Sequence, residues 1–185
     1  MSVVEPVHPL LGDLVLGHHG AEGTPGITFD APARDIVQLL ARRGREVAGM
    51  PAPGRSAATP FGTALWLQPG VWAITAPRGP EGALAARLAE RFADAAVVVD
   101  QSHGRVTIGI EGPAARKMLA KGIRLDLHPK VFAVGSVAAT ECAQLGVALH
   151  RADETRYELI VMATFARELW HFLTESAAEF GYVAA

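Results

Sequence analysis

The sequence predicts an α+β domain in which helices pack on a largely antiparallel sheet. Two segments, 63–75 and 145–161, have the pattern of β-hairpins, because runs of β-forming residues flank a turn or a polar connection. Two other segments, 81–92 and 165–180, repeat apolar residues every three or four positions, as amphipathic helices do. Strands and helices mixed in this order favour the α+β class.

The elements are expected in the order hairpin, helix, strand pair, helix, hairpin, helix. Before the first hairpin, residues 36–40 predict a short strand and residues 42–48 predict a helical turn or two. The hairpin itself consists of Thr63–Leu67 and Val71–Thr75, which are rich in β-formers and flank a Pro-Gly turn.

A helix is expected after Pro80, which suits a first-turn position. Three apolar residues then recur at four-residue spacing and form one stripe: Leu84, Leu88 and Phe92. Beyond this helix, the apolar residues of 97–99 and 106–110 predict a pair of strands on either side of a polar turn.

The second half is expected to hold two helices around another hairpin. Pro113 lies where a helix would begin and Gly122 where it would end. Apolar residues alternate at 145–149 and 157–161, which predicts the hairpin. Thr164 is expected to cap a last, long helix with one apolar face, made of Phe165, Leu169, Phe172, Leu173 and Phe180.

Length and composition indicate one folded domain. A chain of 185 residues can bury roughly 70% of its unfolded surface. Glycines in a Gly/His/Pro-rich stretch at 17–26 favour an extended N-terminal arm over residues 1–26, followed by a single α+β domain over 27–185. The formal net charge of -2, with acids and bases interspersed, lacks the concentrated basic face that nucleic-acid binding requires.

The sequence favours a cytoplasmic protein that does not enter a membrane. Cys142 is the only cysteine, so no internal disulfide can form, and a reducing compartment is the natural inference. Glu5 stands where a signal peptide carries basic residues, and Pro6 and Pro9 interrupt any apolar run there. No uninterrupted apolar run approaches the about 20 residues that span a bilayer.

The first candidate functional segment is a polar turn that contains Asp100, Ser102, His103 and Arg105. A histidine beside a hydroxyl suggests a general base and its nucleophile. Adjacent side chains on an extended segment point to opposite faces, however, so Ser102 and His103 are not expected to form a dyad. We expect hydrogen bonds of Asp100, Ser102 and Arg105 to fix the turn, with a role at a subunit boundary as the alternative.

The second candidate segment follows the expected helix at 113–122 and carries four ionisable residues: Lys121, Arg124, Asp126 and His128. Bases near the carboxyl end of a helix complement its dipole, which offers a local explanation for Lys121 and Arg124. Composition does not explain Asp126 and His128 in this way. The loop could present charge pairs to another protein, with a solvated helix end as the alternative.

No catalytic, cofactor or metal site is predicted within the chain. His18 and His19 lack the cysteine or carboxylate companions that a closed metal site needs. Neither a strand followed by G-x-G-x-x-G nor G-x-x-x-x-G-K-[ST] occurs, which argues against flavin, NAD or nucleotide sites of those types. We expect Trp66, Trp72 and Trp170 in the core rather than at a substrate.

Five short motifs occur in order along the chain: ALWLQPGVW at 64–72, DQSHGR at 100–105, EGPAA at 111–115, LAKGIRLDLHP at 119–129 and FAVG at 132–135. In this order they resemble the gamma subunit of heterotetrameric sarcosine oxidase. The resemblance covers most of residues 36–181. The gamma-type subunit of N-methylglutamate dehydrogenase is closely similar.

The resemblance implies a fold like the first, folate-binding domain of glycine-cleavage aminomethyltransferase. It also implies a non-catalytic structural subunit that assembles with alpha, beta and delta subunits, mainly with alpha. The resemblance further favours a docking or loop-fixing role for Asp126 and His128. Such a complex demethylates sarcosine oxidatively to glycine, with hydrogen peroxide and either formaldehyde or methylenetetrahydrofolate as products. FAD, FMN, NAD, tetrahydrofolate and zinc are then expected in the complex, and none of them in this chain.

Two alternatives remain at this point. One is the gamma-type subunit of N-methylglutamate dehydrogenase, whose electron acceptor is not oxygen. The other is a stand-alone, folate-binding aminomethyl carrier. The fold resemblance supports the carrier, but Cys142–His150 lacks the carboxylate that the aminomethyltransferase family has near its second hairpin.

Overall fold

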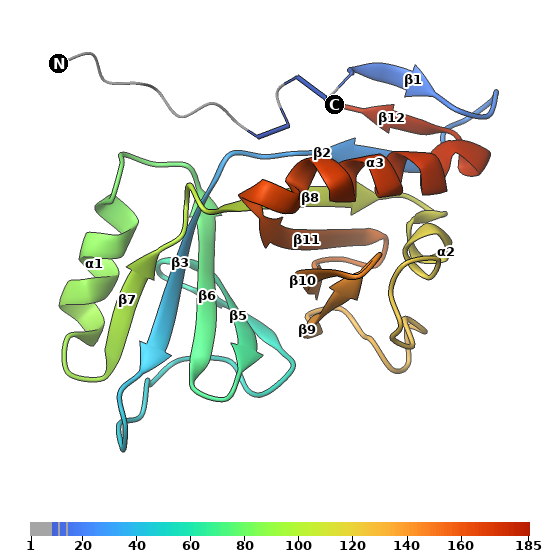
Figure 1. Cartoon of the computed structure of the whole chain (residues 1–185). Helices are drawn as coiled ribbons and strands as arrows, with labels where there is room; N and C mark the ends of the chain where they lie inside the picture. The colour runs from blue at the N-terminus through green and yellow to red at the C-terminus, as the bar shows by residue number, and fades with distance from the viewer. Residues whose placement is uncertain (1–8, 11, 14) are drawn as a thin grey trace, which may run out of the picture.

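The computed structural model describes residues 9–10, 12–13 and 15–185, and two sheets form its frame (Figure 1). In spatial order, the seven-stranded sheet contains β1 (Gly17–His19), β12 (Tyr182–Ala184), β2 (Ile27–Asp30), β8 (Arg105–Glu111), β11 (Arg156–Met162), β10 (Leu145–Arg151) and β9 (Val137–Cys142). The five-stranded sheet contains β4 (Ser56–Thr59), β5 (Gly62–Gln68), β6 (Val71–Pro77), β3 (Arg34–Ala41) and β7 (Ala96–Asp100). The pairing is antiparallel except between β2 and β12.

The helices cover the outer faces of the two sheets, and the inner faces meet (Figure 1). α2 (Ala115–Leu119) and α3 (Ala166–Ala177) pack on the seven-stranded sheet, and α1 (Ala83–Phe92) packs on the five-stranded sheet. Between the sheets lies a smaller apolar cluster made of Ile36, Leu65, Ala73, Val137, Ala148 and Ile160. Alternation along each strand therefore supplies one residue to an outer core and the next to the contact between sheets.

The α+β class and the elements with clear periodicity are confirmed. β5 pairs with β6 and β10 pairs with β11, as the two predicted hairpins require. The stripe predicted for α1 is buried, and it consists of Leu84, Leu88 and Phe92. Trp170 is buried as expected, whereas Trp66 and Trp72 are half-buried.

Four local predictions were wrong. Residues 42–48 form a turn around Gly44, whose φ of 73° interrupts a helix. The helix expected over 113–122 spans only the five residues of α2. Thr164 does not cap α3, because a 3-10 turn at Ala163–Phe165 precedes this helix. β7 and β8 belong to different sheets and do not pair with each other.

The extended arm expected over residues 1–26 falls partly on residues 1–8, 11 and 14, which lie outside the described residues. Within the described part, β1 pairs antiparallel with β12, so that His18 lies opposite Val183. Leu10 is fully buried in the core of the seven-stranded sheet. The described part of this segment therefore packs against the rest of the chain.

A buried carboxylate joins the two sheets where their inner faces meet. Glu158 on β11 is 8% exposed, and its Oε1 accepts a hydrogen bond from Nη2 of Arg34 on β3 at 3.0 Å. Its Oε2 lies 3.3 Å from Nδ1 of His150 on β10, whose Nε2 is 3.0 Å from Oγ of Ser56 on β4. Because Arg34 and Ser56 belong to the five-stranded sheet, these contacts connect the sheets.

Glu158 has a lowered pKa despite its burial. Burial raises the pKa of this carboxyl, but the hydrogen bond from His150 and the charge of Arg34 lower it, and the net pKa lies below the ordinary value of 4.5. A carboxylate of this kind stabilises the fold above its unfolded-state pKa, and that contribution is lost as the pH falls through the folded-state pKa.

A second ion pair crosses the middle of the seven-stranded sheet over a glycine. Both carboxylate oxygens of Asp30, on β2, accept hydrogen bonds from Nη2 of Arg156 on β11, at 3.0 and 2.8 Å. β8 lies between these two strands. A Cβ at Gly109 on β8 would lie 1.9 Å from Asp30 Oδ1 and 2.6 Å from Arg156 Nη2. Any other residue at this position would occupy the space of the ion pair.

We expect Glu158→Gln to lower the free energy of unfolding by about 3 kcal/mol near neutral pH, because a buried ion pair that loses one partner leaves charge uncompensated. Glu175→Gln is the control, since Glu175 pairs with His171 on the exposed face of α3; its effect should stay below about 0.5 kcal/mol. Denaturant titration measures both. As the pH falls from the ordinary glutamate pKa through the lowered folded-state pKa, wild type and Glu158→Gln should converge, and a difference that persists in strong acid would contradict this role.

Gly109→Ala should destabilise the fold by at least about 2 kcal/mol, because the added methyl group must displace Asp30 or Arg156 from their ion pair. Gly146→Ala on β10 is the matched control, since a Cβ there meets no atom within 4 Å. Thermal unfolding followed by circular dichroism compares the two variants. Equal effects of both substitutions would show that the close approach at Gly109 is unimportant.

Candidate functional site

The polar turn predicted from the sequence carries the chain from one sheet to the other. We call residues 101–104, between β7 and β8, the inter-sheet turn. The backbone N–H of Ser102 donates to Asp100 Oδ1 at 2.9 Å. The hydroxyl Oγ of Ser102 accepts from the N–H of Ile36 on β3 at 3.0 Å. The N–H groups of Gly104 and Arg105 both donate to the carbonyl oxygen of Gln101 at 3.0 Å. These bonds close the turn and attach it to β3.

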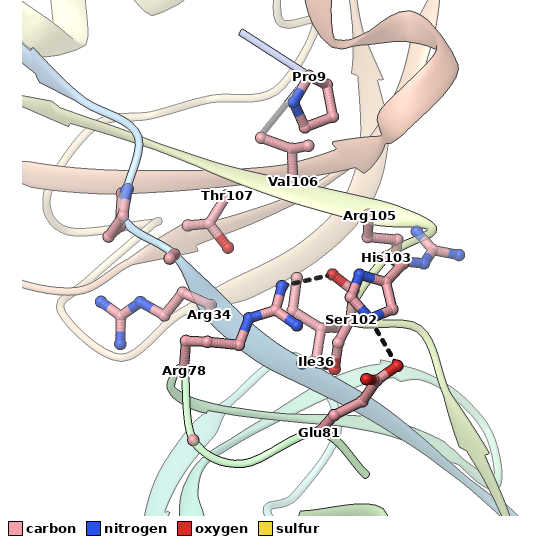
Figure 2. A pocket seen from close by; sticks show the side chains of 13 residues that line it. Pro9, Arg34, Ile36, Arg78, Glu81, Ser102, His103, Arg105, Val106 and Thr107 are labelled. Atoms are coloured by element: carbon pink, nitrogen blue, oxygen red, sulfur yellow. Dashed lines mark hydrogen bonds and ion pairs between the residues drawn. The ribbon is translucent and has the colours of Figure 1, made fainter. Parts of the chain in front are cut away.

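A cavity of about 410 Å³ lies beside the inter-sheet turn (Figure 2). The residues that shape its chemistry come from both sheets and their connections, and they are Arg34, Ile36, Arg78, Ser102, His103 and Arg105. Arg78 Nη2 donates to the carbonyl oxygen of Ser102 at 2.9 Å, while its Nη1 lies 3.5 Å from Asp35 Oδ1. Figure 2 shows the side chains of Arg78 and Thr107 facing the same space.

Ser102 and His103 do not contact each other as a nucleophile and a base. The Ser102 hydroxyl is buried and engaged by β3, whereas His103 is exposed and its Nε2 lies 3.5 Å from Oε1 of Glu81. Arg105 contributes its backbone N–H to the turn. Its side chain makes none of the expected hydrogen bonds within the described part of the chain, and its Nε is buried without a partner.

Lys121 contacts the carboxyl end of α3, whereas the sequence predicted that it lies at the end of α2. Its Nζ donates to the carbonyl oxygen of Ser176 at 2.6 Å, pairs with Glu179 and lies 4.9 Å from the centre of the Phe180 ring. These groups belong to the end of α3 and the turn after it. Lys121 therefore satisfies the carboxyl end of α3, whose dipole favours a cation, rather than the end of α2.

Asp126 and His128 hold their own loop in shape. Asp126 Oδ1 accepts a hydrogen bond from the N–H of His128 at 2.8 Å, and Nδ1 of His128 accepts from the N–H of Lys130 at 3.3 Å. Arg124 is exposed. Leu127, between the polar residues, is buried in the core and anchors the loop to the seven-stranded sheet. The geometry matches a loop-fixing arrangement of the kind that Asx turns provide.

Sequence reasoning missed the charged residues that connect the sheets. Glu158 and His150 lie within the continuously buried parts of β11 and β10, and Arg34 and Asp35 begin β3. The sequence did offer a signal for these contacts, namely a charged residue inside an otherwise apolar strand. Such a residue needs a partner of opposite charge when it is buried. The partner itself could not be identified from local sequence.

The only cysteine of the chain is not a reactive thiol. Cys142 is fully buried, and burial raises the pKa of its thiol to about 12, so the thiol stays protonated at neutral pH. Over residues 9–10, 12–13 and 15–185, no three His, Cys, Asp or Glu side chains are grouped as a metal site requires. No helix in the same part of the chain is long and apolar enough to cross a membrane.

Comparison with known sequences identifies one family. The model of the sarcosine oxidase, gamma subunit family matches residues 50–179. Sarcosine oxidase subunit gamma of Corynebacterium sp. strain P-1 is 36% identical over 121 residues, which cover 64% of this chain and 59% of that protein. The corresponding subunit of Corynebacterium sp. strain U-96 is 33% identical over 140 residues, which cover 71% and 65%. The chain thus matches about three fifths of the length of these relatives.

Comparison with solved structures agrees. A chain of the heterotetrameric sarcosine oxidase from Corynebacterium sp. U-96, in complex with pyrrole 2-carboxylate, superposes with a TM-score of 0.75 at 27% identity, and 88% of each chain is covered. Glycine cleavage system aminomethyltransferase T from Bartonella henselae superposes with a TM-score of 0.66 at 16% identity, and the match covers 87% of this chain and 48% of that chain. This superposition confirms the expected fold. On the family match over residues 50–179, this chain belongs to the sarcosine oxidase gamma subunit family.

Proposed function

We propose that this chain is the gamma subunit of a heterotetrameric sarcosine oxidase and carries no catalytic residues of its own. In this proposal the complex demethylates sarcosine oxidatively to glycine, producing hydrogen peroxide and either formaldehyde or methylenetetrahydrofolate. The observation that carries the proposal is the superposition on a chain of a heterotetrameric sarcosine oxidase over 88% of both chains. The structural use of the Ser102 hydroxyl by β3 supports the non-catalytic part.

The partners in this proposal are the alpha, beta and delta subunits, with alpha as the main contact. FAD, FMN, NAD, tetrahydrofolate and zinc belong to those subunits or to the assembled complex. The loop around Asp126 is a suitable docking surface, because Leu125, Val131 and Val134 are 38%, 65% and 41% exposed on it beside Arg124. Apolar side chains exposed next to charged ones are typical of subunit contacts.

The two alternatives differ in what they require of other chains. An N-methylglutamate dehydrogenase subunit would use the same fold and similar contacts, and its substrate and acceptor would be selected elsewhere in the complex. A stand-alone folate carrier has the likeness to aminomethyltransferase T in its favour, which is a likeness of fold. Folate binding by the isolated chain distinguishes the carrier from either subunit.

Affinity purification of the tagged chain from its native host should recover three different partner chains and bound flavin. The native mass of the purified sample and its flavin absorbance measure this. Oxidation assays with sarcosine and N-methylglutamate on the same sample then separate the oxidase from the dehydrogenase. Recovery of the chain alone, colourless and able to bind tetrahydrofolate, would replace the subunit proposal with the carrier.

His103→Ala should leave sarcosine turnover by the purified complex unchanged, because His103 lies at the surface beside Glu81 and has no contact with the Ser102 hydroxyl. Oxygen consumption measures turnover. His171→Ala on the exposed face of α3 serves as the control for the same substitution. A large loss of turnover in His103→Ala alone, with assembly and flavin content intact, would make His103 a catalytic residue and overturn the non-catalytic assignment.

A further inference from the structure

Among the described residues, one arginine of the cavity beside the inter-sheet turn has no carboxylate partner. Two of the three arginines that line it are engaged, Arg34 with Glu158 at 3.0 Å and Arg78 with Asp35 at 3.5 Å. Arg105 forms no ion pair with any described residue, and its Nε is buried without a hydrogen-bond acceptor. The charge of Arg105 is therefore not compensated by the part of the chain that the structure describes.

The buried Nε–H of Arg105 lacks an acceptor among the described residues. Burial lowers the pKa of Arg105 below its ordinary value, and no neighbouring acid acts in the opposite direction. Oγ1 of Thr107 is a second buried polar atom in the same cavity wall without a hydrogen-bond partner among the described residues. Buried polar groups in folded proteins almost always have partners. Two unmet groups in one cavity indicate that a polar group from outside the described chain belongs there.

The chemistry of the cavity favours a carboxylate with a short apolar body. A guanidinium presents a planar fork of N–H donors that matches the two oxygens of a carboxylate. Ile36 and Val106 also line the cavity, and Figure 2 shows them on different sides of it. Glu81 also lines it, with its Oε1 3.5 Å from His103, and its negative charge disfavours a doubly charged group such as a phosphate.

We propose that this cavity binds a monocarboxylate, held by the guanidinium of Arg105, with its apolar part inside the cavity that Ile36 and Val106 help to line. Its volume of about 410 Å³ falls in the range of small-ligand sites. The carboxylate is that of a free small molecule or that of an acidic side chain from a neighbouring subunit. Both sources have the same chemistry at Arg105, and the experiment separates them.

Calorimetric titration of the full chain with propionate, at constant ionic strength, tests the site. We expect saturable binding of propionate and none of propionamide, its neutral analogue. Arg105→Gln should weaken binding by at least about tenfold, as the loss of a charge-assisted hydrogen bond implies, and Arg105→Lys should weaken it less. Arg45→Gln removes an exposed arginine outside the cavity and should leave binding unchanged. The melting temperature of each variant without ligand verifies that it is folded.

Absence of saturable heat up to about 50 mM propionate, or equal binding by folded Arg105→Gln, would overturn the site. This titration needs no other subunit, so its failure would leave the proposed function untouched. The same titration on the purified assembly distinguishes the two sources. If propionate binds to the assembly, the natural ligand is a free carboxylate. If propionate does not bind to the assembly and Arg105→Gln assembles more weakly, the ligand is a carboxylate of a neighbouring subunit. Loss of binding with unchanged assembly would contradict both.

Discussion

The arrangement of the two sheets depends on charge that is buried between them. Glu158 on the seven-stranded sheet is held by Arg34 of the five-stranded sheet, and the apolar cluster between the sheets has fewer residues than either outer core. A buried carboxylate is tolerated only where its partners are in place, so the contact specifies one relative position of the sheets more strictly than apolar packing does. The absence of a side chain at Gly109 lets the neighbouring Asp30–Arg156 ion pair cross β8 beside it.

The start of β3 transmits this constraint to the candidate site. Three consecutive residues there bind three different elements: Arg34 binds β11, Asp35 accepts from the N–H of Gly79 at 3.0 Å, and the N–H of Ile36 donates to Ser102. Side chains alternate across a strand, so a charged residue directed to the seven-stranded sheet is followed by one directed to the segment after β6. The inter-sheet turn and the cavity are consequently placed by the same short stretch that fixes the sheets.

Local patterns were sufficient for the elements whose burial is periodic, and insufficient for contacts between distant residues. The stripe of α1 and the two hairpins are properties of neighbouring residues. Arg156 and Asp30 are 126 residues apart, and Lys121 binds the end of a helix 55 residues away. The DQSHGR segment was correctly predicted as a turn with strands on both sides. That the strands enter different sheets depends on their partners β3, β2 and β11, which the local sequence does not specify.

The contacts of the DQSHGR segment give most of its residues a structural use within the chain. Asp100 and Gln101 close the turn, and Ser102 attaches it to β3. These groups form hydrogen bonds within the chain. Arg105 is different, because its backbone closes the turn while its guanidinium has no described partner. If an outside carboxylate binds there, the segment that joins the two sheets is also the one that contacts other molecules, and its motif meets both requirements.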